Sequence, residues 1–266
     1  MSARQGRKLR AREAREAREA AAMRARAAAT RRKRLRLLYG MFAAAVVVVA
    51  LSIAISSGGS STASAAGGGK LIGASFSSRL FAGLPQHGTL LGRADAPVRI
   101  VEFADLQCPY CDEYTVQALP TLVQRYVRTG EVSMRFENLS FIGPDSVAAG
   151  RVAAATGQQD RLWNFVDLLY LNQGDENTGY VTPAYIGRLL EAVPGLNLSA
   201  ALRASRTPAA GGALAQANEV ASQDGIDETP SFLIGRVGGP LRLFQPSSLQ
   251  AGPFVQAIDG LLGRSR

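Results

Sequence analysis

The pattern of apolar and polar positions predicts alternating strands and helices downstream of residue 97. The segment 98–103 is apolar at all but two positions, which is typical of a buried β-strand. Residues 131–138 alternate between apolar and polar side chains, as a half-buried strand does. Between these strands we expect one helix over 108–128, kinked at Pro120 because proline lacks a backbone N–H.

Helical periodicity continues after the second strand, and two short strands and a final helix follow it. The order strand–helix–strand, helical block, strand–strand–helix predicts an α/β fold with a central mixed sheet. We interpret Tyr170, Tyr180 and Tyr185 as core residues of this block. The helices are expected over 146–156, 160–171, 183–193, 199–204, 212–223 and 253–262, and the short strands over 231–234 and 241–244.

A different apolar pattern lies upstream. No charged residue occurs from 37 to 69, and residues 37–57 are predicted to form a single transmembrane helix, since about 20 apolar residues span the hydrocarbon core. Residues 1–36 hold 14 basic and 3 acidic residues, so this tail is expected in the cytoplasm and the downstream part outside. Residues 58–84 are expected to be a flexible linker. The small residues Ala63-Ser64-Ala65 leave a cleaved signal peptide as the alternative.

Composition narrows the function classes. The net charge of +9 comes from the tail, since the rest of the chain has 16 basic and 18 acidic residues. The globular part therefore gives no reason to expect nucleic acid, and only the tail leaves a polyanion-binding arm open. Two cysteines exclude a disulfide-stapled scaffold and a four-cysteine metal site within one chain. The single histidine, His87, excludes a multi-histidine site, so no metal site is expected.

Both cysteines occur in one motif, Cys108-Pro109-Tyr110-Cys111, which follows the first strand and opens a helix. A cysteine at a helix N-terminus faces unpaired N–H groups and the positive end of the helix dipole, which lower its pKa. We therefore expect Cys108 to attack and Cys111 to resolve, with Pro109 at the first helical position, where a missing N–H costs nothing. A structural disulfide is the weaker alternative, because so short a loop would stabilise the fold by only about 1.9 kcal/mol. The remaining alternatives are that the two cysteines form half of a zinc site or that their spacing occurs by chance.

The motif and its surroundings resemble the DsbA-like thiol–disulfide oxidoreductases, which have a thioredoxin fold. The resemblance covers about 85–266 and implies that 142–225 is a helical insertion into that fold. It also implies that the Thr229–Pro230 bond is cis and that this loop holds an extended client peptide. The segments that carry it are Ala96-Pro97, Glu102-Phe103-Ala104-Asp105-Leu106-Gln107-Cys108-Pro109-Tyr110-Cys111 and Thr229-Pro230-Ser231-Phe232.

Three residues near the motif have expected roles. Glu102 lies mid-strand, where burial would raise its pKa. The resemblance implies that it relays the proton of Cys111, and an edge-strand carboxylate facing water is the alternative. Asp105 is expected to shape the turn into the helix. The resemblance implies that Tyr110, between the cysteines, helps to set the redox potential of Cys108. The Pro-Tyr pair differs from the Pro-His pair of the strongest oxidants in the family.

These expectations combine into a membrane-tethered, extracytoplasmic thiol–disulfide oxidoreductase, with oxidation favoured over isomerisation or reduction. Its partners would be exported client proteins with cysteines and a membrane redox partner, either a quinone-linked oxidase or a reductase. No cofactor is expected beyond a redox-active disulfide between Cys108 and Cys111. The alternative is a non-catalytic, membrane-anchored peptide-binding or chaperone module on the same fold.

Overall fold

The computed structural model describes residues 70–264. The expected basic tail over 1–36 and the expected transmembrane helix over 37–57 lie outside the described residues. Within residues 70–264, no helix is both long enough and apolar enough to cross a membrane.

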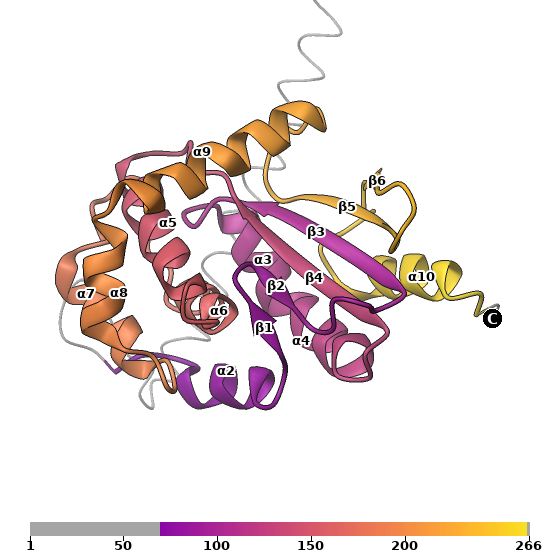
Figure 1. The fold of residues 1–266 in the computed structure, drawn as a ribbon, viewed down its shortest axis with the longest axis horizontal. Coiled ribbons are helices and arrows are strands. Elements are labelled where there is room, and N and C mark those ends of the chain that lie inside the picture. Colours follow the sequence, from indigo (N-terminus) through magenta and orange to yellow (C-terminus); the bar gives the residue numbers. More distant parts are fainter. Residues whose placement is uncertain (1–69, 265–266) are drawn as a thin grey trace, which may run out of the picture. The chain divides into compact units, whose positions relative to one another are not determined.

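A six-stranded mixed sheet runs through the described part of the chain, in the order β1-β2-β4-β3-β5-β6. The central strand β3 pairs in parallel with β4 and antiparallel with β5, so the expected mixed sheet is confirmed. Because β3 has a neighbour on each side, six of its seven residues are buried. The strands are β1 (Gln86–His87), β2 (Leu90–Leu91), β3 (Val98–Ala104), β4 (Val132–Asn138), β5 (Ser231–Arg236) and β6 (Arg242–Phe244) (Figure 1).

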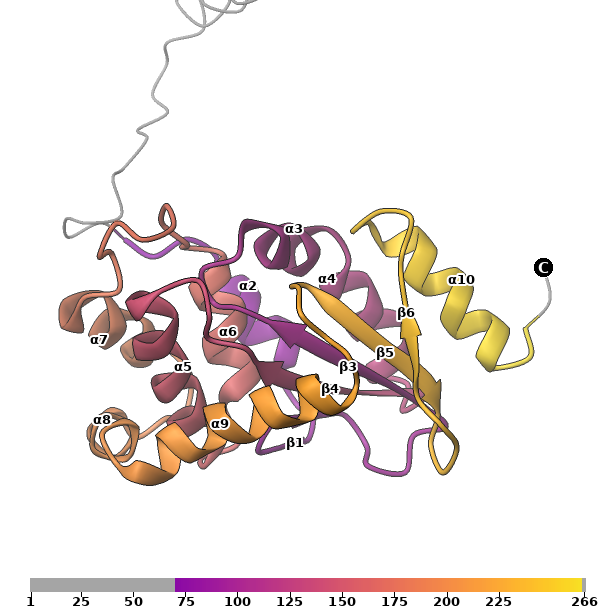
Figure 2. The ribbon, with the colours of Figure 1, turned by 90° about the horizontal axis from the view of Figure 1, so that it is seen from above.

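Helices cover both faces of this sheet. Figure 2 shows α3 and α10 on one side and α9 on the other. The larger core lies on the α3 side and includes Tyr114, Phe232 and Phe254, whereas Phe103 and Ala217 belong to a smaller core under α9. The helices are α2 (Ala74–Phe81), α3 (Pro109–Gln117), α4 (Leu119–Leu122), α5 (Pro144–Gly157), α6 (Leu162–Tyr170), α7 (Pro183–Ala192), α8 (Leu198–Ser205), α9 (Pro208–Gln223) and α10 (Ala251–Leu261).

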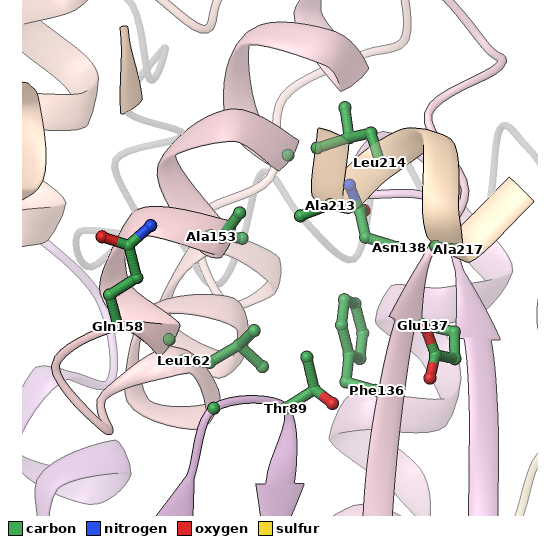
Figure 3. A pocket seen from close by; sticks show the side chains of 14 residues that line it. Thr89, Phe136, Glu137, Asn138, Ala153, Gln158, Leu162, Ala213, Leu214 and Ala217 are labelled. Carbon is green, nitrogen blue, oxygen red and sulfur yellow. The ribbon is translucent and has the colours of Figure 1, made fainter. Parts of the chain in front are cut away.

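The helical block between β4 and β5 is confirmed, and α5 to α9 correspond to its five predicted helices. The largest difference is at α9, which begins at Pro208 rather than at residue 212. Pro208 occupies the first helical position, where its fixed φ favours helix initiation. A cavity of about 240 Å³ lies between α5, α9 and the end of β4 (Figure 3). Alanines such as Ala153 and Ala213 line much of it, and none of its lining residues is a predicted site residue.

The helix expected over 108–128 is instead divided into three segments. α3 ends at Gln117, α4 restarts at Leu119, and a π-helical turn, η1, covers Val123–Val127. The break falls at Ala118, two residues before Pro120, which sits in the first turn of α4, where its missing N–H leaves no intrahelical hydrogen bond unmade. The structure therefore has an interruption within two residues of the predicted kink at Pro120, but the expectation of a single helix was wrong.

The flexible linker expected over 58–84 does not extend over its last part, because α2 forms there. Leu80 and Phe81 of α2 are buried in the larger core. The Arg128 guanidinium donates hydrogen bonds to the carbonyls of Leu80, at 2.8 Å, and Ala82, at 3.1 Å. The packed part of the chain therefore begins well before residue 85.

Candidate active site

The two cysteines lie where β3 leads into α3. Cys108 is the N-cap residue of α3, with extended backbone at φ −70° and ψ 121°, and Pro109 follows in the first turn. Cys111 lies one turn further along. Both are free thiols and buried, with 4% of Cys108 and 0% of Cys111 exposed. Tyr110 between them points outward and is 63% exposed.

The loop before β5 completes this site, although its Thr229 is 121 positions further along the chain than Cys108. The Cys108 thiol donates a hydrogen bond to the Thr229 carbonyl, with 3.4 Å between Sγ and oxygen. The Thr229–Pro230 peptide bond is cis, as expected. The fold therefore brings Cys108, Cys111 and the Thr229–Pro230 loop together.

The two thiols have opposite electrostatic environments. The pKa of Cys108 is lowered to about 6, chiefly by a hydrogen bond from the Cys111 side chain. Hydrogen bonds from the Thr229 side chain and from the N–H groups of Tyr110 and Cys111 lower it further, while burial opposes them. Burial raises the pKa of Cys111 well above its ordinary value, and the bond to Cys108 adds to this. At neutral pH, Cys108 is therefore mainly a thiolate, the reactive form, while Cys111 keeps its proton.

Glu102 lies beneath this pair, on the central strand. Its side chain is buried, 2% of the residue is exposed, and Oε1 has no hydrogen-bond partner among the described residues. Burial raises the Glu102 pKa to about 8. The charge of Glu102 also contributes to the high pKa of Cys111, which places the two groups near each other. An edge-strand carboxylate facing water is excluded, because β3 is flanked by β4 and β5.

The Asp105 carboxylate fixes the turn between β3 and α3, as expected from its position. One oxygen accepts the Gln107 N–H at 2.8 Å and the Ser146 hydroxyl at 2.6 Å. The other accepts the N–H groups of Phe141 and Ile142, at 2.9 and 3.0 Å. These four bonds tie the cysteine turn to the segment that leads into α5, and they leave Asp105 no free oxygen for the thiols.

Side chains of the helical block also hold this turn, which the sequence analysis did not predict. The Tyr170 hydroxyl donates to the carbonyl of residue 105 at 3.0 Å. The Gln173 amide donates to the carbonyls of residues 106 and 108, at 3.1 and 3.3 Å, and the Tyr180 hydroxyl to that of residue 106 at 3.4 Å. Tyr170 and Tyr180 are core residues, as expected. The repeated tyrosines, each with one polar atom on an apolar ring, were the available signal for these contacts.

No group of three or more potential metal-ligating side chains occurs within residues 70–264. His87 lies on β1 at the opposite edge of the sheet from β6, with 71% of its side chain exposed. It takes no part in the cysteine site.

Comparisons with known proteins place this geometry in a family. The model of the thioredoxin family matches residues 86–238. The probable disulfide bond formation protein D of Bacillus cereus is 39% identical over 94 residues, which cover 35% of this chain and 44% of that protein. Disulfide bond formation protein D of Bacillus subtilis is 31% identical over 105 residues, which cover 39% of this chain and 47% of that protein.

The chain therefore spans less than half the length of these two relatives. Among solved structures, oxidised BdbD of Bacillus subtilis has a TM-score of 0.58 at 21% identity, covering 68% of this chain and 97% of that structure. This similarity shows that the two proteins share a fold. Since the family match spans more than half of the chain, this protein belongs to the thioredoxin family.

Proposed function

We propose that this protein is a thiol–disulfide oxidoreductase that exchanges disulfides through Cys108 and Cys111. The observation that carries this proposal is the asymmetry of the pair: a thiolate-forming Cys108 at a helix N-terminus, beside a buried, protonated Cys111. A structural disulfide would not need this asymmetry. The relatives named for disulfide bond formation support the same reaction class.

In the oxidising direction, a client thiolate attacks Cys108 Sγ of the Cys108–Cys111 disulfide. The bond between the two cysteines breaks, and Cys111 leaves as a thiolate and takes up a proton. A second client thiolate then attacks the client sulfur of the mixed disulfide and releases Cys108 as a thiolate, so the client loses two electrons to the protein. The low pKa of Cys108 favours this second step, because a more acidic thiol leaves faster.

The surrounding residues have separate roles in this proposal. Glu102 supplies the proton that Cys111 takes up when it leaves, and accepts it in the reverse direction. The backbone at Thr229 and Pro230 holds the extended client segment next to Cys108. The exposed Tyr110 ring contacts the client, while Pro109 starts the helix without an unmade hydrogen bond.

The proposed setting is the outer face of the cell membrane. The uncharged segment 37–57, directly preceded by a basic tail, supports a single-pass anchor with the catalytic domain outside. The clients would be exported proteins with cysteines. A membrane redox partner, a quinone-linked oxidase in the favoured direction, would restore the disulfide, and the reaction would use no other cofactor.

The test compares the full-length chain with its Cys108→Ser and Cys111→Ser variants. The oxidised wild-type protein should form a disulfide in a reduced peptide with two cysteines, and Cys108→Ser should abolish this. Given the oxidised, disulfide-containing form of the same peptide, reduced Cys111→Ser should accumulate a mixed disulfide between Cys108 and the peptide, seen by mass spectrometry, because no second thiol of the protein can resolve it. A wild-type protein that binds the peptide without oxidising it, and a Cys108→Ser variant that binds it equally well, would contradict the proposal and favour a non-catalytic binding module.

A further inference from the structure

Two buried polar atoms near Cys111 have no hydrogen-bond partner among the described residues. They are Oε1 of Glu102 and the hydroxyl of Tyr114. Leaving such a group unpaired costs about 1–3 kcal/mol, so buried polar groups are rarely left alone without a functional reason.

The fold places Tyr114 over the same part of the sheet as Glu102. Glu102 of β3 pairs directly with Phe232 of β5, and directly opposed residues project from the same face of a sheet. The Tyr114 ring packs on Phe232, with 4.7 Å between ring centroids, and on Phe254 at 5.1 Å. The phenol ring therefore lies against the immediate neighbour of Glu102.

Tyr114 also lies on the same side of α3 as Cys111. The two residues are three positions apart, which places them on one face of a helix, and both are fully buried. The charge of Glu102 raises the pKa of Cys111 and of Tyr114, so Glu102 is near both. Cys111 and Tyr114 therefore share one face of α3, and the Glu102 charge acts on both of them.

The other titratable groups around Glu102 already have partners. The Tyr170 hydroxyl, which also senses the Glu102 charge, donates to the Asp105 carbonyl. The Cys108 thiol donates to the Thr229 carbonyl. The residues directly opposite Glu102 on β4 and β5 are both phenylalanines. Tyr114 is the hydroxyl in this surrounding group that remains available.

We propose that Tyr114 is a positioning residue whose hydroxyl completes the proton route between Cys111 and Glu102. This inference rests on the proposed function. When Cys111 leaves the disulfide as a thiolate, the proton moves from the Glu102 carboxyl group to the Cys111 sulfur, and the carboxylate remains. The Tyr114 hydroxyl, which is unpaired within the described part of the structure, turns to donate a hydrogen bond to whichever of the two groups becomes negatively charged during the reaction. Burial keeps the phenol itself protonated, so its own proton count does not change.

The test removes the hydroxyl alone, with Tyr114→Phe in the full chain. Tyr126→Phe is the matched control, because the Tyr126 hydroxyl is bonded to Asp259 at the far end of this helical segment. Excess reduced glutathione opens the Cys108–Cys111 disulfide, and the released thiols are trapped in acid and counted by mass spectrometry across a pH series. Thermal unfolding checks that both variants remain folded.

Tyr114→Phe should open the disulfide about tenfold more slowly, which corresponds to about 1.4 kcal/mol, and should displace the pH profile of opening. Alkylation of reduced Cys108 should keep its wild-type pH midpoint, and Tyr126→Phe should behave as the wild type. The double variant Tyr114→Phe/Glu102→Gln should open its disulfide no more slowly than Glu102→Gln alone, since both groups serve one step.

Opening of the Tyr114→Phe disulfide at the wild-type rate and with the wild-type pH profile would overturn the inference. Fully multiplicative effects of Tyr114→Phe and Glu102→Gln would overturn it as well. A wild-type protein that does not exchange with glutathione at all would instead refute the proposed function.

Discussion

Replacing Cys111 by alanine removes the contact that contributes most to the low pKa of Cys108. That contact is the hydrogen bond from the Cys111 side chain. A hydrogen bond to a charged group contributes about 1.5–3 kcal/mol, and one pKa unit corresponds to about 1.4 kcal/mol. The Cys108 pKa should therefore rise from about 6 by roughly one to two units in Cys111→Ala. Cys111→Ser, which keeps a hydroxyl donor, should stay close to the wild-type value.

The assay is the rate of alkylation of Cys108 by iodoacetamide as a function of pH, followed by mass spectrometry. Because only the thiolate reacts, the midpoint of the profile reports the pKa. At pH 7 the thiolate fraction should fall from about nine tenths in the reduced wild-type protein to between roughly one half and one tenth in Cys111→Ala. Reduced Cys111 in the wild type should react far more slowly, since it is buried and protonated.

An unchanged midpoint in Cys111→Ala would refute this reasoning. It would mean that the backbone N–H groups at the start of α3, rather than the neighbouring thiol, stabilise the thiolate. A midpoint in Cys111→Ser that follows the alanine variant would show that the packing of the sulfur matters and its hydrogen bond does not.

Three further predictions concern stability. Burial raises the Glu102 pKa from 4.5 to about 8, so the contribution of this group to stability is complete below pH 4.5 and is lost as the pH rises towards 8. At pH 7 this lowers the free energy of unfolding by about 3 kcal/mol, and Glu102→Gln, which cannot ionise, should restore it. Equal free energies of unfolding in urea for the wild type and the variant at pH 7 would argue against this. Asp105→Ala leaves four donors unpaired, two of them buried, and should lower the free energy of unfolding in urea by about 3 kcal/mol. Leu80→Ala should cost about 2–5 kcal/mol, against about 0.5 kcal/mol or less for the more exposed Phe76→Ala, and equal losses would mean that α2 is not packed as described.

Strong local patterns predicted most of the fold. The apolar run of β3 and the periodic helices of the block between β4 and β5 correspond to elements that bury a continuous face. α2 was missed because its eight residues bury only Ser77, Leu80 and Phe81, too few for a visible period. The two-residue strands β1 and β2 are too short for any pattern. β2 forms because β4 offers it an edge, and β1 pairs with β2 in turn.

The reactive residues of the site could be predicted from the sequence, but the hydrogen bonds that hold the cysteine turn could not. The placement of Cys108 at a helix start and of Glu102 in a buried strand could be read from neighbouring residues. The contacts from Tyr170, Gln173 and Tyr180 join residues 65 or more positions apart, and nothing in the local sequence encodes such pairings. The interruption of the α3 segment was visible only as a proline.

The hydrogen bonds from Tyr170 and Gln173 to the cysteine turn limit how this protein can be re-engineered. The cysteine turn cannot be transferred to another protein by itself. The side chains that donate hydrogen bonds to its carbonyls belong to the helical block, which a thioredoxin fold without the insertion would lack. A chimera that receives only the four-residue motif would have the two cysteines but would lack the hydrogen bonds that hold their turn. Exchanges between homologues should therefore move the motif together with the end of α6 and the α6–α7 connection.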